Sequence, residues 1–407
     1  MFEKLLVSAK ALRRHQDGPF AAERERYLQH CSDTGATHGS MRIKCNELLW
    51  VAQLLDADAK NGIDMAGMEV LFNRRMIFQN AATTKPRFIA AARPWLRYLG
   101  WWREPVVVYE FQEKLDQYCL WMRDERGFST STIVGWRYRV RDFLIWCKKN
   151  NHDLQRLRLS DIDAYFIDDD AHQWGRRTVA NVAALLRNFL RYAAWQGWCS
   201  SKFAEAIRGP RIYAQESLTY APHWSDVQRI LAGTLTDVPK DIRDRAILML
   251  LSIYGMRTTE VATLRLDQVD WQQRVIRIFR LKQRQPQVYP LLPSVAHALA
   301  RYIDIARPST SFPEVFVGLH SPQRPLSRAG IYKVVSQRFL MLGIKAIHHG
   351  PHALRHACAT RLLADGLTLK EIGDHLGHRS TEATRIYAKV DLAALREVGD
   401  FDLGDLQ

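Results

Sequence analysis

Cysteine is scarce in this chain of 407 residues, and long apolar runs are missing. The six cysteines form no CxxC pair and no dense framework, which argues against a secreted disulfide scaffold and fits reduced thiols. The N-terminal stretch MFEKLLVSAKALRRHQ interrupts its apolar residues with charges too often for a signal peptide. No apolar run reaches the length that spans a bilayer. We therefore expect a soluble, cytoplasmic protein.

Acidic residues are outnumbered by basic ones, with 43 Asp and Glu against 58 Lys and Arg and a net charge of +15. Such an excess favours a polyanionic partner, because basic side chains displace the counterions that condense on nucleic acid. Charge alone leaves open a merely solvated basic surface. It also does not distinguish DNA from RNA or anionic lipid.

Common cofactor signatures are absent as well. The sequence has no Walker-type phosphate loop and no acidic cluster suited to two Mg²⁺ ions. Four residues are of types that bind zinc, but their spacing matches no familiar zinc pattern: His30, Cys31, His38 and Cys45. We expect no metal site and no cofactor.

The chain is long enough for two or three domains. Residues 1–104 and 105–208 are predicted to be helical, since their apolar residues recur every three or four positions. The stretch 209–223, GPRIYAQESLTYAPH, is typical of a linker. From residue 224 to 407 the sequence predicts helices and one β-hairpin, in which two β-rich runs of RVIRIFRLKQRQPQVYPL flank a polar turn.

A weak internal repeat links the first two segments. RPWLRYLGW at 93–101 aligns without gaps on RNFLRYAAW at 187–195, at an offset of 94 residues, and ERYLQHC at 25–31 resembles EKLDQYC at 113–119. One hypothesis is that residues 1–104 are a second helical module related to 105–208. The alternative is that amphipathic helices share these residue types by composition.

A helix is predicted to begin in GPHALRHACATRLLADG, residues 350–366, because Pro351 suits a first helical turn. His352 then lies in that turn, and Arg355 lies three residues later on the same face. A helix N-terminus with added His and Arg donors can hold an anion such as phosphate. Taken alone, the motif favours a helix whose polar face merely contains basic residues.

A second arginine follows the apolar helix predicted before YGMRTTEVATLRLDQVD, residues 254–270. Arg257 could cap that helix, or it could join Arg355 on one phosphate through paired N–H···O bonds. Glu260 could orient Arg257 or be a surface carboxylate. Lys282, flanked by Arg280 and Arg284, stands at the hairpin turn, where a lysine is either solvated or able to protonate a leaving oxygen.

The stretch LGHRSTEATRIYAKV, residues 376–390, follows a predicted amphipathic helix that ends at Gly377. His378 comes directly after it, and Tyr387 lies within the next predicted helix. A tyrosine hydroxyl is a poor nucleophile unless it is held against an electrophile that cations already neutralise.

These segments, in this order, resemble the catalytic domain of the tyrosine recombinases, the phage integrase family, from about residue 224 to the C-terminus. The resemblance implies a mainly α fold with a small antiparallel β-sheet, in which helical DNA-binding modules precede the catalytic domain, and residues 105–208 are similar to the family's core-binding domain. It also implies that Tyr387 attacks the scissile phosphate to form a 3′-phosphotyrosyl link and free a 5′-hydroxyl. The resemblance implies that Arg257, Arg355 and His378 bind the phosphate. It further implies that His352 assists proton transfer near the tyrosine and that Lys282 donates a proton to the leaving oxygen.

DNA contacts outside the catalytic domain are expected from the basic residues of GWRYRVRDF (135–143) and WGRR (174–177), although each stretch could be only a solvated basic face. The candidates are Arg137, Arg139, Arg141, Arg176 and Arg177. The family often passes a C-terminal segment to a neighbouring protomer. We therefore expect a nucleoid-associated homo-tetramer on two double-stranded DNA sites. Exchange of the tail from Asp391 between protomers is one hypothesis, and a partner recombinase is a further candidate partner.

The function expected from this sequence is site-specific DNA recombination, as the integrase or transposase of a mobile element. Two alternatives remain open at this point. One is a topoisomerase of the same catalytic type, and the other is a DNA-binding regulator that kept the fold and lost catalysis.

Overall fold

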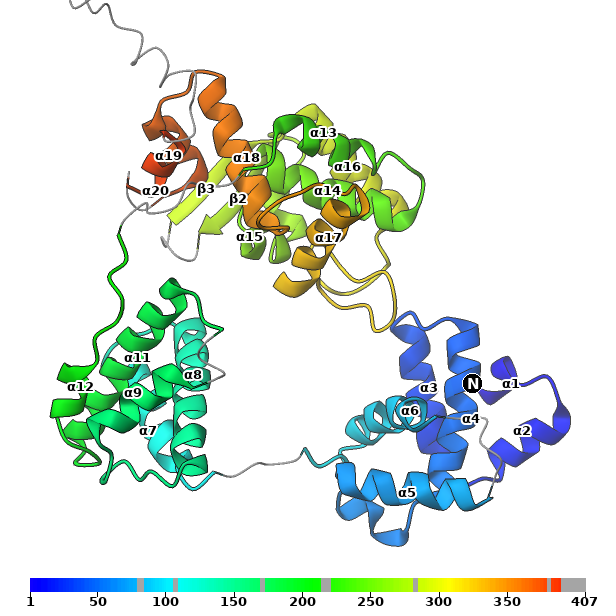
Figure 1. Cartoon of the computed structure of the whole chain (residues 1–407). Coiled ribbons are helices and arrows are strands. Elements are labelled where there is room, and N and C mark those ends of the chain that lie inside the picture. Colours follow the sequence, from blue (N-terminus) through cyan, green and yellow to red (C-terminus); the bar gives the residue numbers. More distant parts are fainter. Residues whose placement is uncertain are drawn as a thin grey trace, which may run out of the picture. The chain divides into compact units, whose positions relative to one another are not determined.

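The computed structural model describes residues 1–78, 84–104, 109–168, 173–213, 221–280, 285–378 and 382–388. It is mainly α-helical with a small antiparallel sheet, which confirms the predicted fold class (Figure 1). The chain divides into two compact units, Met1–Pro105 together with Ser217–Gln407, and Val106–Glu216. Separate hydrophobic cores occupy residues 2–96, 115–207 and 227–357. The division into four segments at residues 104, 208 and 223 stays a prediction.

In the described part of the N-terminal region, six helices and a short 3₁₀ helix, Ala57–Asn61, enclose the first core. The helices are α1 (Phe2–Leu5), α2 (Ala9–Gln16), α3 (Ala21–Asp33), α4 (His38–Leu54), α5 (Met65–Phe78) and α6 (Lys85–Tyr98). Arg24 is fully buried here, and its guanidinium donates to the carbonyl oxygens of Pro19, His15 and Gly18. These bonds compensate the desolvated charge and hold α3 against the turn that follows α2.

The second core lies between the helices of the 106–216 unit. These are α7 (Gln112–Asp124), α8 (Thr130–Lys149), α9 (Leu159–Ile167), α11 (Arg176–Trp195) and α12 (Lys202–Ala206). The hydroxyl of Ser129 caps α8 by accepting a hydrogen bond from the amide of Thr132. Inside the core, the hydroxyl of Tyr118 donates to Asn188 at 2.8 Å and ties α7 to α11.

The burial patterns of these two helical regions match at the offset of the sequence repeat. Five buried residues of α6 align on five buried residues of α11 at 94 positions: Phe88, Ala91, Ala92, Trp95 and Leu96 on Val182, Leu185, Leu186, Phe189 and Leu190. For α3 and α7 the buried positions match at 91 rather than 88, since Tyr27 aligns on Tyr118 and Cys31 on Met122. The relationship between the modules stays a prediction, which these shared faces support.

The third core contains the sheet and most of the remaining helices. These helices are α13 (Trp224–Ala232), α14 (Pro239–Ile253), α15 (Thr258–Ala262), α16 (Pro293–Arg301), α17 (Arg328–Met341) and α18 (Pro351–Ala364), with a 3₁₀ turn at Leu266–Gln268 and a π turn at Tyr302–Ala306. The second half of α18 packs with α19 (Leu369–Leu376) and α20 (Glu382–Ala388) around a smaller cluster of buried residues, Cys358, Ala359, Ile372, Leu376 and Tyr387. Strands β1 (Val269–Asp270), β2 (Val275–Arg280) and β3 (Gln285–Pro290) pair antiparallel in sequence order, with Ile276 opposite Tyr289. The predicted hairpin is confirmed as β2–β3.

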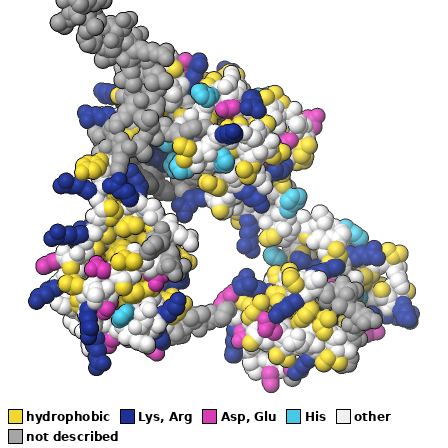
Figure 2. Space-filling view, viewed as in Figure 1, with side chains coloured by type: hydrophobic (Ala, Val, Ile, Leu, Met, Phe, Trp, Pro, Cys, Tyr) yellow, Lys and Arg dark blue, Asp and Glu magenta, His cyan; other side chains and the backbone are white. Residues whose placement is uncertain are grey.

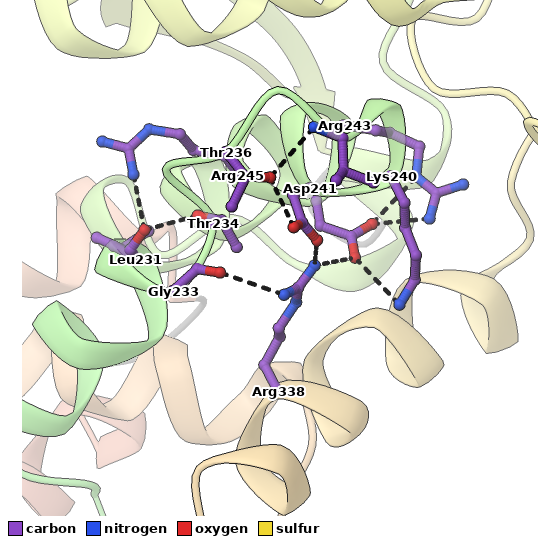
Figure 3. A network of polar contacts seen from close by, with 11 residues as sticks. Leu231, Gly233, Thr234, Thr236, Lys240, Asp241, Arg243, Arg245 and Arg338 are labelled. Atoms are coloured by element: carbon purple, nitrogen blue, oxygen red, sulfur yellow. Dashed lines mark hydrogen bonds and ion pairs between the residues drawn. The ribbon is translucent and has the colours of Figure 1, made fainter.

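A largely buried polar network joins α17 to α14 and holds these two helices together (Figure 3). Arg338 on α17 donates to the carboxylates of Asp241 and Asp244 on α14, with the bond to Asp244 at 2.8 Å. Arg243 also donates to Asp244, at 2.7 Å, and Asp244 is fully buried. Because each buried charge has an opposite partner, the network holds α17 in one register against α14.

In the part of the chain that the structure describes, no helix has both the length and the apolar character to cross a membrane.

Candidate active site

Two of the predicted site residues, Arg257 and Arg355, meet at the C-terminal end of α19, where Gly377 ends the helix in the left-handed region at a φ of 61°. Figure 1 shows α18, α19 and α20 beside the hairpin β2–β3. Arg355 donates to the carbonyl oxygen of Leu376 at 2.7 Å, and Arg257 donates to that of Gly377 at 2.7 Å. The end of a helix with free carbonyl groups carries partial negative charge, so it attracts guanidinium groups. The site is therefore gathered around a helix terminus that attracts cations.

Arg257 lies in the turn between α14 and α15 and is held in place by contacts with α15. The turn after α14 passes through Gly255 at a φ of 59°, and Arg257 then precedes the first residue of α15. Glu260 accepts from the Arg257 backbone amide at 2.7 Å and from its guanidinium at 2.9 Å. Arg257 is thus placed before α15 and does not cap the C-terminus of α14, and Glu260 is a buried partner and not a surface carboxylate.

Helix α18 begins at Pro351, as predicted, so Arg355 lies in its second turn, and its side chain is buried. Its guanidinium donates to the carbonyl oxygens of Gly255 and Leu376. Burial, reinforced by the nearby Arg257 charge, lowers the pKa of Arg355 to about 10, so it remains a cation at neutral pH. Two predicted phosphate-binding arginines therefore lie close enough to influence each other electrostatically.

Tyr387 lies in α20 and is only 1% exposed. Its Oη is 3.0 Å from Nδ1 of His356, and its ring stacks on His378 with centroids 6.3 Å apart. Burial raises the pKa of Tyr387 to about 12, with Arg355 opposing that rise. The hydroxyl is therefore protonated in this structure.

His378 follows Gly377 directly, in the position predicted from the sequence. Its Nδ1 is 2.8 Å from Oγ1 of the fully buried Thr384, which ties the end of α19 to α20. Burial, with the charges of Arg355 and Arg257, lowers the pKa of His378 to about 4. At neutral pH the ring is uncharged and can donate one hydrogen bond and accept another.

His352 is exposed in the first turn of α18. It lines a surface depression of about 670 Å³, together with Arg257, Thr258, Thr259, Ser327, Arg328, Ala329 and Tyr332. The depression thus brings His352 and Arg257 to one open surface, formed by the beginnings of α15, α17 and α18. An extended polyanion can reach these side chains there.

His356 is the site residue that the sequence interpretation missed. It follows Arg355 in the stretch HALRHAC and lies four residues after His352, so both histidines are on the same side of α18. The spacing of the two histidines by four residues was the sequence signal that could have identified His356 as a second site residue. Only the position of α20 shows that the second histidine meets the tyrosine.

Lys282 and Arg284 lie outside the described residues. Arg280, which precedes them at the end of β2, is 1% exposed. It donates to the carbonyl oxygens of Leu376 and His375 and to the hydroxyl of Tyr289. Its side chain therefore fastens the hairpin that carries Lys282 to the C-terminus of α19.

The predicted DNA-contacting arginines lie on two helices of the 106–216 unit. Arg137, Arg139 and Arg141 are partly exposed on α8, where Arg137 pairs with Asp116 at 2.7 Å. Arg176 and Arg177 are exposed in the first turn of α11, which confirms the predicted helix start. Figure 2 shows Lys and Arg side chains mainly around the rim of the visible face of this module, mixed with acidic ones.

The four residues considered for zinc are held in other contacts. His30 stacks on Tyr98 and His38 lies 2.9 Å from the carbonyl oxygen of Lys4, while Cys31 and Cys45 are buried. Among the described residues, no group of three or more His, Cys, Asp and Glu could hold a metal ion.

Comparison with known proteins places this geometry in a family. Residues 224–393 match the phage integrase family, and residues 115–197 match the N-terminal SAM-like domain of phage integrases. An integrase/recombinase of Sinorhizobium fredii is 34% identical over 287 residues, which cover 70% of this chain and 69% of that protein. The tyrosine recombinase XerD of Listeria monocytogenes is 30% identical over 280 residues, which cover 67% of this chain and 93% of XerD.

Two solved structures share the fold at low sequence identity. The XerH site-specific recombinase bound to palindromic difH substrate is 18% identical, with a TM-score of 0.54 over 88% of this chain and 96% of XerH. The Tn1549 transposon integrase in complex with transposon right end DNA is 16% identical, with a TM-score of 0.52 over 70% of this chain and 98% of that chain. The chain belongs to the tyrosine recombinase, or phage integrase, family and is a tyrosine-type site-specific DNA recombinase.

Proposed function

We propose that this recombinase cuts and rejoins double-stranded DNA of a mobile element through a 3′-phosphotyrosyl intermediate on Tyr387. The observation that carries the proposal is the meeting of Tyr387, Arg355, Arg257 and His378 around the C-terminus of α19. These residue types supply a nucleophile, two fixed cations and a neutral hydrogen-bonding ring. They are the parts that an in-line attack on a phosphodiester needs.

The two arginines act on the phosphate. Arg257 and Arg355 bind its non-bridging oxygens and neutralise the charge that gathers there as Tyr387 attacks. The contacts with Glu260 and with the α19 carbonyl groups hold the guanidinium groups in place before DNA arrives. Preorganised donors need little rearrangement in the transition state, which is where their stabilisation counts.

The remaining side chains handle protons and the leaving group. Lys282 protonates the leaving 5′-oxygen, His352 assists proton transfer at the open depression, and His378 donates a hydrogen bond to the phosphate. The bond energy of the phosphodiester is kept in the phosphotyrosyl link, so a second 5′-hydroxyl can restore the DNA. No step in this sequence requires ATP or a metal ion.

DNA binding outside the active site is assigned to α8 and α11, through Arg137, Arg139, Arg141, Arg176 and Arg177. A homo-tetramer on two DNA sites would pair one cleavage with another. The tail from Asp391, which would be exchanged between protomers, lies outside the described residues. Residues 1–104 precede both matched domains and offer a further surface for DNA or a partner recombinase.

A nicked suicide duplex tests the chemistry. The cognate site is first selected from randomised duplexes that the protein retains, and cleavage is then followed in EDTA without ATP. Wild type and a Tyr213→Phe control should trap a covalent protein–DNA adduct, whereas Tyr387→Phe should form none. An adduct with Tyr387→Phe would refute the assignment of the nucleophile.

The same material separates recombination from its rivals. Exchange of strands between two cognate sites supports the recombinase. Relaxation of plasmids without any cognate site would favour a topoisomerase of the same catalytic type. Specific binding without cleavage would favour a regulator that has lost catalysis.

A further inference from the structure

A single buried polar contact holds the hydroxyl of Tyr387 among the described residues. The side chain is 1% exposed, and its Oη lies 3.0 Å from Nδ1 of His356. The two rings are tilted by 57° with centroids 5.7 Å apart, so the contact is made at the edge of the imidazole and not through its face. The distance and the approach are those of a hydrogen bond.

The position of His356 on α18 brings its ring near both His352 and Tyr387. His352, one turn earlier, is exposed at the surface depression, and the two histidine rings are 6.4 Å apart. Arg355, the residue before His356, is buried toward Gly255 and Leu376. The first two turns of α18 thus carry an exposed histidine, His352, a buried cation, Arg355, and a histidine that contacts the tyrosine, His356.

The charge state of His356 follows from these surroundings. Burial lowers its pKa to about 4, and the nearby His352, Arg355 and His348 act in the same direction. A neutral imidazole has one nitrogen that accepts. When Nδ1 accepts the tyrosine hydroxyl, the ring proton lies on Nε2. A group that holds its proton so weakly is suited to orient a hydroxyl and not to remove its proton at neutral pH.

We propose that His356 is a positioning residue for the nucleophile: its neutral imidazole accepts a hydrogen bond from the Tyr387 hydroxyl and keeps Oη docked beside Arg355 and His378. The inference rests on the proposed function, in which Tyr387 is the nucleophile. A buried hydroxyl without a partner is unfavourable, so the contact selects one orientation of the side chain. A nucleophile that is held about 1 Å away from its productive position reacts more slowly.

The test compares replacements that differ in where they put an acceptor. His356→Asn keeps a polar atom near the Nδ1 position, His356→Gln moves it toward the Nε2 position, and His356→Leu removes it while filling similar space. His297→Leu, at an exposed histidine on α16, is the matched control. Single-turnover cleavage of the suicide duplex, binding of the intact duplex and thermal unfolding are measured for each variant.

We expect His356→Leu and His356→Gln to cleave about tenfold more slowly than wild type, which is the rate equivalent of one hydrogen bond. His356→Asn should recover most of the rate, and DNA binding should be unchanged in all four variants. Wild-type cleavage by His356→Leu would overturn the proposal. Equal losses for Asn, Gln and Leu would also overturn it, because a role in packing alone does not depend on the acceptor position.

A readout that does not depend on cleavage separates this inference from the proposed function. In ¹⁵N spectra of histidine-labelled protein, Tyr387→Phe should shift the signal of the one histidine whose resonance disappears in His356→Asn. Adduct formation by Tyr387→Phe would refute the nucleophile assignment, whatever the spectra show. An unshifted His356 signal in Tyr387→Phe would refute the hydrogen bond even if Tyr387 is the nucleophile.

Discussion

Gly377 offers a sharp test of how the site is assembled. It ends α19 at a φ of 61°, and a methyl group there would overlap with Nη1 of Arg280. Arg280 is buried and donates to the Leu376 and His375 carbonyl groups and to Tyr289. Gly377→Ala should therefore impose backbone strain and also push a buried guanidinium off its acceptors.

Gly366 is the matched control for the strain alone. It follows α18 at a φ of 88°, and no atom lies within 4 Å of a methyl group built on it. Gly366→Ala should lower the free energy of unfolding by about 1–2 kcal/mol, the cost of left-handed backbone for a residue with a Cβ. Gly377→Ala should cost about 2–4 kcal/mol more, because hydrogen bonds from a buried charged group are lost. The total of roughly 3–6 kcal/mol corresponds to a fall of roughly 6–24 °C in Tm, at about 2–4 °C per kcal/mol for a domain of this size.

Thermal unfolding followed by circular dichroism measures the two variants side by side. The Arg280→Met background completes a double-mutant cycle, since it removes the guanidinium that the new methyl group would strike. In that background Gly377→Ala should cost only the amount that Gly366→Ala costs. Equal losses for Gly377→Ala and Gly366→Ala in the wild-type background would show that Arg280 does not pack against the end of α19.

Three further predictions follow from other contacts. Arg338→Ala should lower the free energy of unfolding by about 1.5–3 kcal/mol in urea titrations, because Asp241 and the buried Asp244 lose a charged hydrogen-bond donor, while Arg243 still pairs with Asp244; a loss below 1 kcal/mol would contradict the network. His356 and His378 are neutral in the fold with pKa values of about 4, whereas a histidine in the unfolded chain titrates near 6.5. Stability should therefore stay level above pH 6.5 and fall between pH 6.5 and 4, by at most about 1.4 kcal/mol per pH unit for each histidine; a flat profile from pH 7.5 to 5 in urea titrations would refute this. Glu260→Ala should release the Arg257 guanidinium and slow single-turnover cleavage about 10- to 100-fold with little change in DNA binding, and an unchanged cleavage rate would show that Arg257 needs no such support.

Local sequence signals were sufficient for the elements that carry the site. Pro351 at the start of α18, Gly377 at the end of α19 and the alternating residues of β2 act within one turn or one strand, so their consequences can be read from neighbouring positions. The order of the motifs was enough to indicate the family, which the comparisons confirm. The roles of the individual site residues stay predictions.

No local sequence signal shows which residues, far apart in the chain, meet in the folded protein. Arg280 reads as one of several basic residues at a hairpin turn, yet it is buried because the strand alternation turns it toward the end of α19, 96 residues away. The sequence left Glu260 as either a partner of Arg257 or a surface carboxylate, and the choice between them depends on where α15 begins.

By itself, the sequence determined the helices, the hairpin, the family and the identity of Tyr387 as the candidate nucleophile, since periodicity, caps and ordered motifs are properties of short segments. Only the tertiary structure decided that the arginines gather on the carbonyl groups of one helix end and that His356, rather than His352, meets the tyrosine hydroxyl. The physical reason is that a helix offers several faces, and its neighbours in the fold determine which face is buried and which polar groups must find partners there.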